Sequence, residues 1–161
     1  MSDLVAIGLG ANLGDLDHAL RDAVQAIAGL PQTTLVSVSS LYRSAPIDAG
    51  GPDYLNAVAL VRTQMQPLPF LQALQAIEQA AGRQRSYRNA PRTLDLDIEL
   101  WGEQVIDLPD LSVPHPRMWQ RAFVLLPLAE LLPERISPAQ LAAVADQRIE
   151  RMASPQQSWW A

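Results

Sequence analysis

The chain has 161 residues, of which 48% are hydrophobic, and its mean hydropathy of +0.01 is typical of a soluble globular protein. All twelve cationic residues are arginine, against 17 acids, so the net charge is −5, and the absence of lysine excludes a Schiff-base lysine and a P-loop. The absence of cysteine excludes disulfides and thiol nucleophiles, and two histidines are too few for a multi-histidine metal centre. We therefore expect any metal to be a hard cation on carboxylates, and any phosphate to bind arginine and backbone amides.

The N-terminal residues show no export signal, and no segment is suited to span a membrane. The first fifteen residues carry acids but no basic segment, and the longest apolar stretch, 123–132, is interrupted by Pro127 and Glu130. We therefore expect a cytoplasmic protein that makes no membrane contact. The acidic net charge argues against a nucleic-acid partner.

Strand and helix patterns alternate over the first two thirds of the chain. Apolar or alternating runs predict strands over residues 4–10, 33–43, 54–63 and 93–101. Apolar residues at helical spacing predict a helix that Asp15 caps and Gly29 ends, and a second helix that begins at Pro67 or Pro69 and ends at Gly82. The resulting β-α-β-β-α-β order predicts an α+β, ferredoxin-like core, in which an antiparallel sheet carries both helices on one side.

After this core, the sequence pattern predicts extra C-terminal strands and helices. A small strand is expected near 104–106, a helix over 118–126, and a last helix that begins at Ser137 and Pro138. The sequence contains no internal repeat and no low-complexity linker, so residues 1–161 are predicted to form a single domain.

Two acids on the last core strand are the strongest local signal for chemistry. That strand alternates, with Leu94, Leu96, Ile98 and Leu100 predicted on one face and three acids on the other: Asp95, Asp97 and Glu99. Residues two apart on a strand lie roughly 6.6 Å apart on the same face, so the carboxylates of Asp95 and Asp97 can bind one or two Mg²⁺ together with phosphate oxygens. The same pattern also fits the solvated face of an edge strand.

A cationic segment directly precedes this strand. Four of the twelve arginines lie within ten residues, and Glu78 is the one acid nearby: the arginines are Arg83, Arg85, Arg88 and Arg92. The planar guanidinium group suits bidentate recognition of phosphate, and solvated charge runs usually mix both signs. A cationic segment that leads into a carboxylate pair therefore favours a site for a Mg²⁺-nucleotide.

Other candidate residues are less specific. The glycines of segment 8–14 do not form a dinucleotide-binding motif, because the third glycine is one position late and the predicted order is not repeated βαβ. Tyr54 and Asn56 share one strand face, where they could stack on and read a flat ligand or simply pack in the core. His115, between two prolines, fits either a ligand contact or a structural hydrogen bond.

Seven segments in order resemble the 6-hydroxymethyl-7,8-dihydropterin pyrophosphokinase family, which transfers the pyrophosphate of ATP to a pterin alcohol in folate synthesis. The resemblance extends over residues 5–134, in segments 10–14, 40–44, 52–56, 82–83, 91–97, 113–115 and 121–123. Segment 91–97, Pro-Arg-Thr-Leu-Asp-Leu-Asp, is the family signature. The resemblance implies the ferredoxin-like fold, an ATP- and Mg²⁺-dependent pyrophosphokinase with two small-molecule substrates, and a monomer.

The resemblance also implies roles for individual residues. Asp95 and Asp97 are expected to bind two Mg²⁺, and Arg83 and Arg92 to contact the phosphates during transfer. The nucleotide is expected to lie near Glu78, Arg85, Arg88, Arg92, Ile98, Ser112, His115 and Arg121. The pterin is expected between Tyr54 and Phe123, with Asn56 reading its edge, and further substrate contacts are expected from Asn12, Ser44, Ala45 and Ile47.

Several positions depart from the family pattern. Asn89 and Ala90 stand where Trp-Gly is common, Asp110 stands where an arginine often contacts the nucleotide, and Pro116 stands where tyrosine is common. The corresponding contacts are not expected here. None of these departures touches the acid pair.

Two other classes of function remain open from the residues alone. A ferredoxin-like domain can bind a small ligand for regulation without catalysis, because fold does not determine function. An RNA-recognition module shares the same order of elements, but it needs exposed aromatic residues and a basic sheet face where this chain has acids. Formation of AMP from Mg²⁺-ATP and the pterin alcohol distinguishes the enzyme from both.

Overall fold

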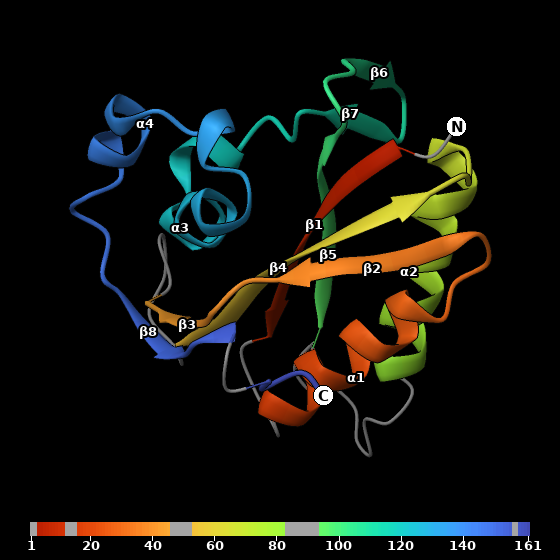
Figure 1. The fold of residues 1–161 in the computed structure, drawn as a ribbon, viewed down its shortest axis with the longest axis horizontal. Coiled ribbons are helices and arrows are strands. Elements are labelled where there is room, and N and C mark those ends of the chain that lie inside the picture. Colours follow the sequence, from red (N-terminus) through yellow and green to blue (C-terminus); the bar gives the residue numbers. More distant parts are fainter. Residues whose placement is uncertain (1–2, 12–15, 46–52, 83–93, 156–157) are drawn as a thin grey trace.

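The computed structural model describes residues 3–11, 16–45, 53–82, 94–155 and 158–161 (Figure 1). Its strands are β1 (Asp3–Ala11), β2 (Thr33–Val38), β3 (Leu41–Ser44), β4 (Tyr54–Thr63), β5 (Asp95–Trp101), β6 (Ile106–Leu108), β7 (Leu111–Val113) and β8 (Ile149–Ala153). Its helices are α1 (Leu16–Ala28), α2 (Pro67–Gly82), α3 (Ala122–Leu131) and α4 (Pro138–Ala143), with 3₁₀ helices η1 (Met118–Gln120) and η2 (Pro133–Arg135). The predicted order is present as β1-α1-β2-β4-α2-β5, which confirms the α+β, ferredoxin-like fold.

The large sheet is antiparallel, and β4 is its central strand. The strands are ordered β5-β1-β4-β3-β8, and β2 also pairs with β4. Because β2 lies beside the C-terminal half of β4 and β3 beside its N-terminal half, the single strand predicted over 33–43 is in fact two strands. The break lies at buried Ser39, whose N–H donates to the Val58 carbonyl and whose Oγ accepts from the Val58 N–H, both at 2.9 Å.

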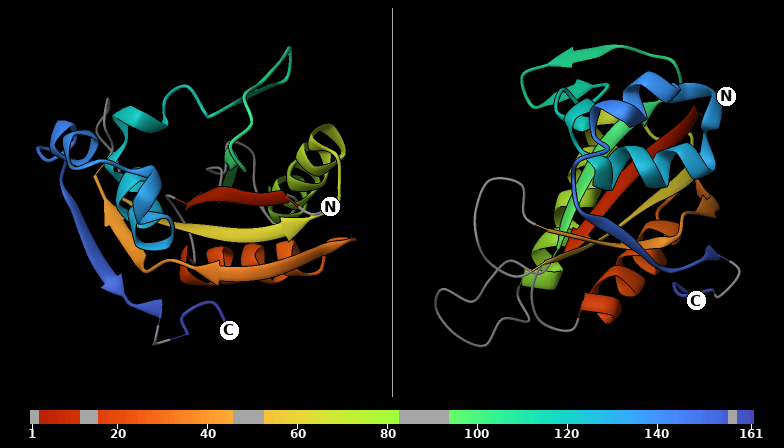
Figure 2. Two further views of the ribbon diagram at one scale, coloured as in Figure 1. Left: turned by 45° about the horizontal axis from the view of Figure 1, so that its top comes forward. Right: turned by 90° about the vertical axis from the view of Figure 1, so that its left-hand side faces the viewer.

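Different helices cover the two faces of the sheet (Figure 2). Helices α1 and α2 pack on one face, over a core that includes Leu20, Phe70 and Ile98. Helix α3 packs on the other face, over a second core that includes Met118 and Leu125. Both core helices thus lie on one side, as predicted, and the segment from η1 to α4 covers the opposite side.

A β-bulge in β5 reverses the sheet face on which the side chains that follow it lie. Ile98 pairs with Ile7 of β1, but Leu100 pairs with Ala6, so Glu99 is an extra residue with no partner in the register. Ile98 therefore belongs to the core under α1 and α2, whereas Leu100 belongs to the core under α3. The prediction that Leu100 shares a face with Ile98 is wrong, because one extra residue reverses the alternation.

The C-terminal third differs from the prediction mainly in element positions. The small strand lies at 106–108 as β6, which forms a hairpin with β7, and the helix predicted over 118–126 is η1 followed by α3. Helix α4 begins at Pro138 behind a capping box of Ser137 and Gln140. The sequence does not predict β8, since its partner β3 lies far earlier in the chain. Over the described ranges, none of the helices has the length and apolar character that crossing a membrane requires.

The C-terminal residues pack against the core on the α1 side. Trp159 Nε1 donates to the Ser39 carbonyl at 2.9 Å, Gln25 Nε2 donates to the Trp160 carbonyl at 2.8 Å, and both indole rings contact the core. We expect Trp159→Ala to lower the free energy of unfolding by about 2 kcal/mol, because it removes a half-buried ring and a hydrogen bond. Urea unfolding measures this, with exposed Met152→Ala as the control. An unchanged midpoint for Trp159→Ala would contradict the prediction.

Candidate active site

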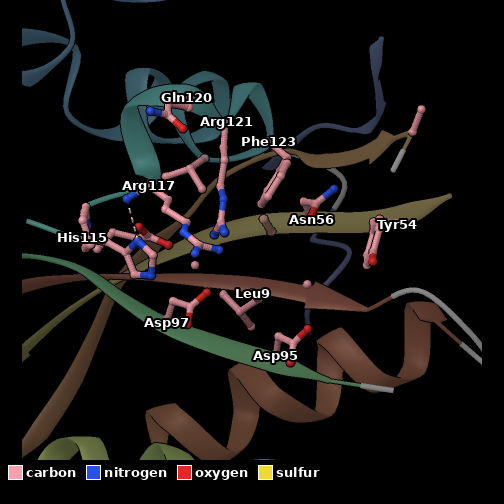
Figure 3. A pocket seen from close by; sticks show the side chains of 17 residues that line it. Leu9, Tyr54, Asn56, Asp95, Asp97, His115, Arg117, Gln120, Arg121 and Phe123 are labelled. Carbon is pink, nitrogen blue, oxygen red and sulfur yellow. Dashed lines mark hydrogen bonds between the residues drawn. The ribbon is translucent and has the colours of Figure 1, made fainter. Parts of the chain in front are cut away.

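Residues far apart in the sequence line one cavity on the α3 side of the sheet (Figure 3). Its volume is about 990 Å³, within the range of sites that bind small molecules. Eight residues of the predicted site line it: Ala45, Tyr54, Asn56, Asp95, Asp97, His115, Arg121 and Phe123. The structure thus brings the predicted metal-binding acids together with most of the predicted pterin contacts.

Asp95 and Asp97 both lie on the pocket face of β5 (Figure 3). In the register with β1, Asp95 pairs with Gly10 and Asp97 pairs with Gly8, so no side chain of the neighbouring strand covers the acids. Burial raises the pKa of Asp97, and the charge of Asp95 adds to this effect, whereas facing basic residues oppose it. A cation bound beside the pair would relieve this unfavourable burial of charge.

The segment between β7 and α3 forms the opposite wall of the cavity. It contributes four polar residues: His115, Arg117, Gln120 and Arg121. His115 N donates to the Glu99 carbonyl at 3.0 Å, and its Nδ1 accepts from Arg117 N at 3.2 Å. Burial lowers the pKa of His115, so the ring is neutral at pH 7 and carries its proton on Nε2. The sequence prediction includes His115 and Arg121 but misses Arg117 and Gln120, because this irregular segment has no periodicity.

The first residues of α3 direct a charge and a ring into the pocket. The guanidinium carbon of Arg121 lies 5.5 Å from the centroid of the Phe123 ring, within the range of cation–π contacts (Figure 3). The last turn of the helix is fixed to the sheet, since Glu130 accepts hydrogen bonds from Ser40 N at 2.8 Å and from the Tyr42 hydroxyl. Burial and the neighbouring Glu130 carboxylate raise the pKa of Tyr42, so this hydroxyl keeps its proton.

Tyr54 and Asn56 lie on the pocket face of β4, as the alternation predicts. Asn56 is 2% exposed, and its Nδ2 donates to the Oγ of buried Ser44 at 2.7 Å, which fixes the orientation of the amide. The rings of Tyr54 and Phe123 and the Asn56 amide lie along one side of the cavity (Figure 3). This arrangement suits a flat heterocycle with polar edges.

Four described residues of the predicted site do not line this cavity, and one of them is Ser44, which is buried behind Asn56. Glu78 of α2 accepts a hydrogen bond from Leu96 N at 2.8 Å and so connects α2 to β5. Ile98 is buried in the core under α1 and α2, and Ser112 is exposed on β7. The place of the other three near the nucleotide stays a prediction. Six further residues of the predicted site lie outside the described residues: Asn12, Ile47, Arg83, Arg85, Arg88 and Arg92.

Glu99 also lines the cavity, although the strand alternation predicts only that it lies on the acidic face of β5. Its side chain is 1% exposed, and within the described ranges its Oε2 has no hydrogen-bond partner. Burial raises the pKa of its carboxyl to about 8, and the charge of Asp97 adds to this effect, whereas Arg121 opposes it. The alternation of the strand points to the correct face, but the burial depends on the bulge.

The chain matches the family model described as 7,8-dihydro-6-hydroxymethylpterin-pyrophosphokinase over residues 6–133. It is 48% identical over 159 residues to the 2-amino-4-hydroxy-6-hydroxymethyldihydropteridine pyrophosphokinase of Pseudomonas aeruginosa, over 94% of this chain and 98% of that protein. It is 44% identical over 133 residues to the protein of the same name from Haemophilus influenzae, over 82% and 83% of the two chains. A crystal structure of Plasmodium falciparum HPPK-DHPS with pterin and p-hydroxybenzoate superposes on 83% of this chain with a TM-score of 0.65, at 14% identity, and this chain spans 40% of that one.

The likeness to the Plasmodium structure shows the fold alone, because the sequence identity is low. The family match and the bacterial relatives cover most of the chain. They confirm the resemblance over residues 5–134, together with the pyrophosphokinase activity and the role in folate synthesis that it implies. The chain therefore belongs to the 7,8-dihydro-6-hydroxymethylpterin-pyrophosphokinase family.

Proposed function

We propose that this pyrophosphokinase binds Mg²⁺-ATP and the pterin alcohol together in the cavity between β5 and α3, and transfers the pyrophosphate there. The observation that carries the proposal is that one cavity joins two kinds of recognition: acids and arginines on one part of its wall, and two rings with a fixed amide on another. The hydroxymethyl oxygen attacks the β-phosphorus in line, and AMP leaves. Such a transfer needs no covalent enzyme intermediate, in keeping with a chain that has neither cysteine nor lysine.

Asp95 and Asp97 are the proposed ligands of two Mg²⁺. Their half-buried carboxylates share one strand face beside two glycines, and hard oxygen ligands of this kind suit Mg²⁺. Because the protein supplies only two carboxylates, water and phosphate oxygens would fill the remaining coordination positions of the ions. When bound, the ions would neutralise the charge that develops on the transferred phosphates.

The arginines and His115 are the proposed phosphate contacts. Arg117 and Arg121 face the acids across the cavity and carry charge that substrate phosphates would neutralise. The neutral His115 ring accepts the Arg117 N–H at Nδ1 and therefore has an Nε2–H to donate to a phosphate oxygen. Arg83 and Arg92 are proposed as further phosphate contacts on the family pattern.

Tyr54, Asn56 and Phe123 are the proposed pterin contacts. We expect Tyr54→Ala to weaken binding of the pterin about tenfold, because stacking on an aromatic ring is worth roughly 1–3 kcal/mol. Tyr54→Phe keeps the ring and serves as the control, with affinity close to that of the wild type. Calorimetric titration with the pterin alcohol measures both. Equal affinity of Tyr54→Ala and the wild type for the pterin would contradict the proposed stacking and would favour a packing role for Tyr54.

The whole reaction is tested by incubating the protein with Mg²⁺-ATP and the pterin alcohol, and by separating the products. We expect stoichiometric AMP and pterin diphosphate, and no AMP when Mg²⁺ is chelated. Binding of both substrates without formation of AMP would contradict catalysis and would favour a ligand-sensing domain.

We also propose that residues 1–161 act as one domain, as a monomer in the cytoplasm. The support is that strands from both ends of the chain join one sheet, since β1 lies beside β4 and β8 lies beside β3. Sedimentation at micromolar concentration tests the proposed monomer, and a dimer mass would contradict it.

A further inference from the structure

The side-chain amide of Gln147 binds the backbone on both sides of Arg121. Gln147 lies in the turn between α4 and β8. Its Oε1 accepts a hydrogen bond from Ala122 N at 2.8 Å, and its Nε2 donates to the Gln120 carbonyl at 2.7 Å. Gln120 and Ala122 are the two neighbours of Arg121 in the sequence. One amide group therefore holds the short segment from which the Arg121 side chain extends into the cavity (Figure 3).

The position of Arg121 between η1 and α3 explains why this segment needs a partner from elsewhere in the chain. Arg121 is the N-cap of α3, with extended backbone angles of φ −123° and ψ 110°. The first N–H groups of a helix have no acceptor within the helix, and a guanidinium group has no acceptor to supply. Ala122 is 1% exposed, so water has little access to its N–H. Gln147 supplies the acceptor and leaves the Arg121 side chain to face the cavity.

The turn that carries Gln147 is itself fixed beside the end of β3. The Arg148 carbonyl accepts a hydrogen bond from Ala45 N at 3.2 Å, and the residues that follow pair with β3 as β8. At the same end of β3, Ser44 Oγ accepts a hydrogen bond from Asn56 Nδ2 at 2.7 Å. Gln147 thus extends from a segment that backbone hydrogen bonds hold on the sheet, and its side chain transmits that fixed position to the start of α3.

We propose that Gln147 is a positioning residue that sets the direction in which Arg121 enters the cavity. The inference rests on the proposed function, in which Arg121 contacts the phosphates of the nucleotide. Gln147 lies outside the described wall of the cavity and acts through the backbone beside Arg121. A segment that is ordered before the nucleotide binds lowers the ordering that binding requires. The turn lies beyond residues 6–133, the part of the chain that matches the family model.

Calorimetric titration with Mg²⁺ and a non-hydrolysable ATP analogue provides the first test. Gln147→Met keeps the length of the side chain and removes both hydrogen bonds, and we expect it to weaken nucleotide binding about tenfold at unchanged stoichiometry. Partial unfolding would instead lower the stoichiometry and leave the Kd of the folded molecules unchanged. An unchanged Kd would overturn the proposal.

Gln140→Met is the matched control, because Gln140 also supplies a hydrogen-bond acceptor at the start of a helix. Its Oε1 accepts from Ser137 N at 2.8 Å in the capping box of α4, a helix that carries no proposed site residue. We expect Gln140→Met to bind the nucleotide within about twofold of the wild type. Equal losses of affinity in Gln140→Met and Gln147→Met would show a general effect of helix capping and would overturn the proposal.

Steady-state turnover gives a second readout that separates positioning from folding. Loss of an interaction made equally in the ground state and the transition state raises KM and leaves kcat unchanged. We therefore expect Gln147→Met to raise the KM for ATP about tenfold, with kcat within about threefold of the wild type. Partial unfolding would lower the apparent kcat at an unchanged KM, and that result would contradict the positioning role.

A double-mutant cycle tests whether the effect passes through Arg121. Arg121→Ala should weaken nucleotide binding by itself, and adding Gln147→Met should then cost less than about twofold. Effects that multiply would show that Gln147 acts independently of Arg121, which would overturn the proposal. Unchanged affinity of Arg121→Ala alone, or a wild-type protein that binds no Mg²⁺-nucleotide, would contradict the proposed function itself, and these two measurements distinguish that failure from the others.

Discussion

Asp97→Ala should abolish Mg²⁺-dependent formation of AMP while the fold stays intact. The carboxylate lies on the pocket face of β5 opposite Gly8, where it is one of the two proposed metal ligands. Loss of a ligand whose metal stabilises the phosphate charge of the transition state is expected to lower kcat by at least about a thousandfold. Burial raises the pKa of Asp97, so its removal should not lower the stability of the metal-free protein.

The control for this prediction is Asp146→Ala, which removes an exposed acid that does not line the cavity. Its turnover should equal that of the wild type. Chromatographic assay of AMP and circular dichroism of both variants measure the outcome. Near-normal turnover of Asp97→Ala would contradict the proposal that Asp97 is a ligand of the catalytic metal.

Glu99→Gln should make the metal-free protein more stable, and the gain should grow as the pH rises. Burial raises the pKa of Glu99 from its ordinary value of 4.5 to about 8, so between these values the folded state binds a proton that the unfolded state has released. The stability of the wild type therefore falls as the pH rises through this window. With about 1.4 kcal/mol per pKa unit, the loss above pH 8 is at most about 5 kcal/mol.

Urea unfolding in the presence of a chelator at several pH values measures this difference. The two proteins should be similarly stable near pH 5, and the variant should be more stable by several kcal/mol above pH 8. Glu103→Gln, which neutralises an exposed acid, is the control and should leave the pH profile of the wild type nearly unchanged. Parallel profiles of the wild type and Glu99→Gln would contradict the buried-acid explanation.

The order of the core elements is predictable from the sequence because each element carries its own periodicity. The differences arise where a residue depends on a distant partner. Ser39 divides one predicted strand into two through its bonds to Val58, and β8 exists only as the neighbour of β3. The bulge at Glu99 likewise depends on the pairing of β5 with β1. None of these pairings is visible in a local pattern.

In the candidate site as well, residues on regular strands are predictable from the local sequence, whereas residues on irregular segments are not. The strand period correctly places Asp95 beside Asp97, and Tyr54 beside Asn56, on the pocket face of the sheet. It also points Ile98 away from that face, into the core where the structure buries it. Irregular segments have no such period, so the contributions of Arg117 and Gln120 become visible only in the structure.

The start of α3 links the two halves of the cavity mechanically. Arg121, a proposed nucleotide contact, and Phe123, a proposed pterin contact, are two residues apart, and Glu130 fixes the far end of the same helix to β3. A movement that brings the guanidinium group to a phosphate therefore also moves the ring across the pterin. The two substrates should then raise each other's affinity by one common factor, which titration of each substrate with and without the other would measure.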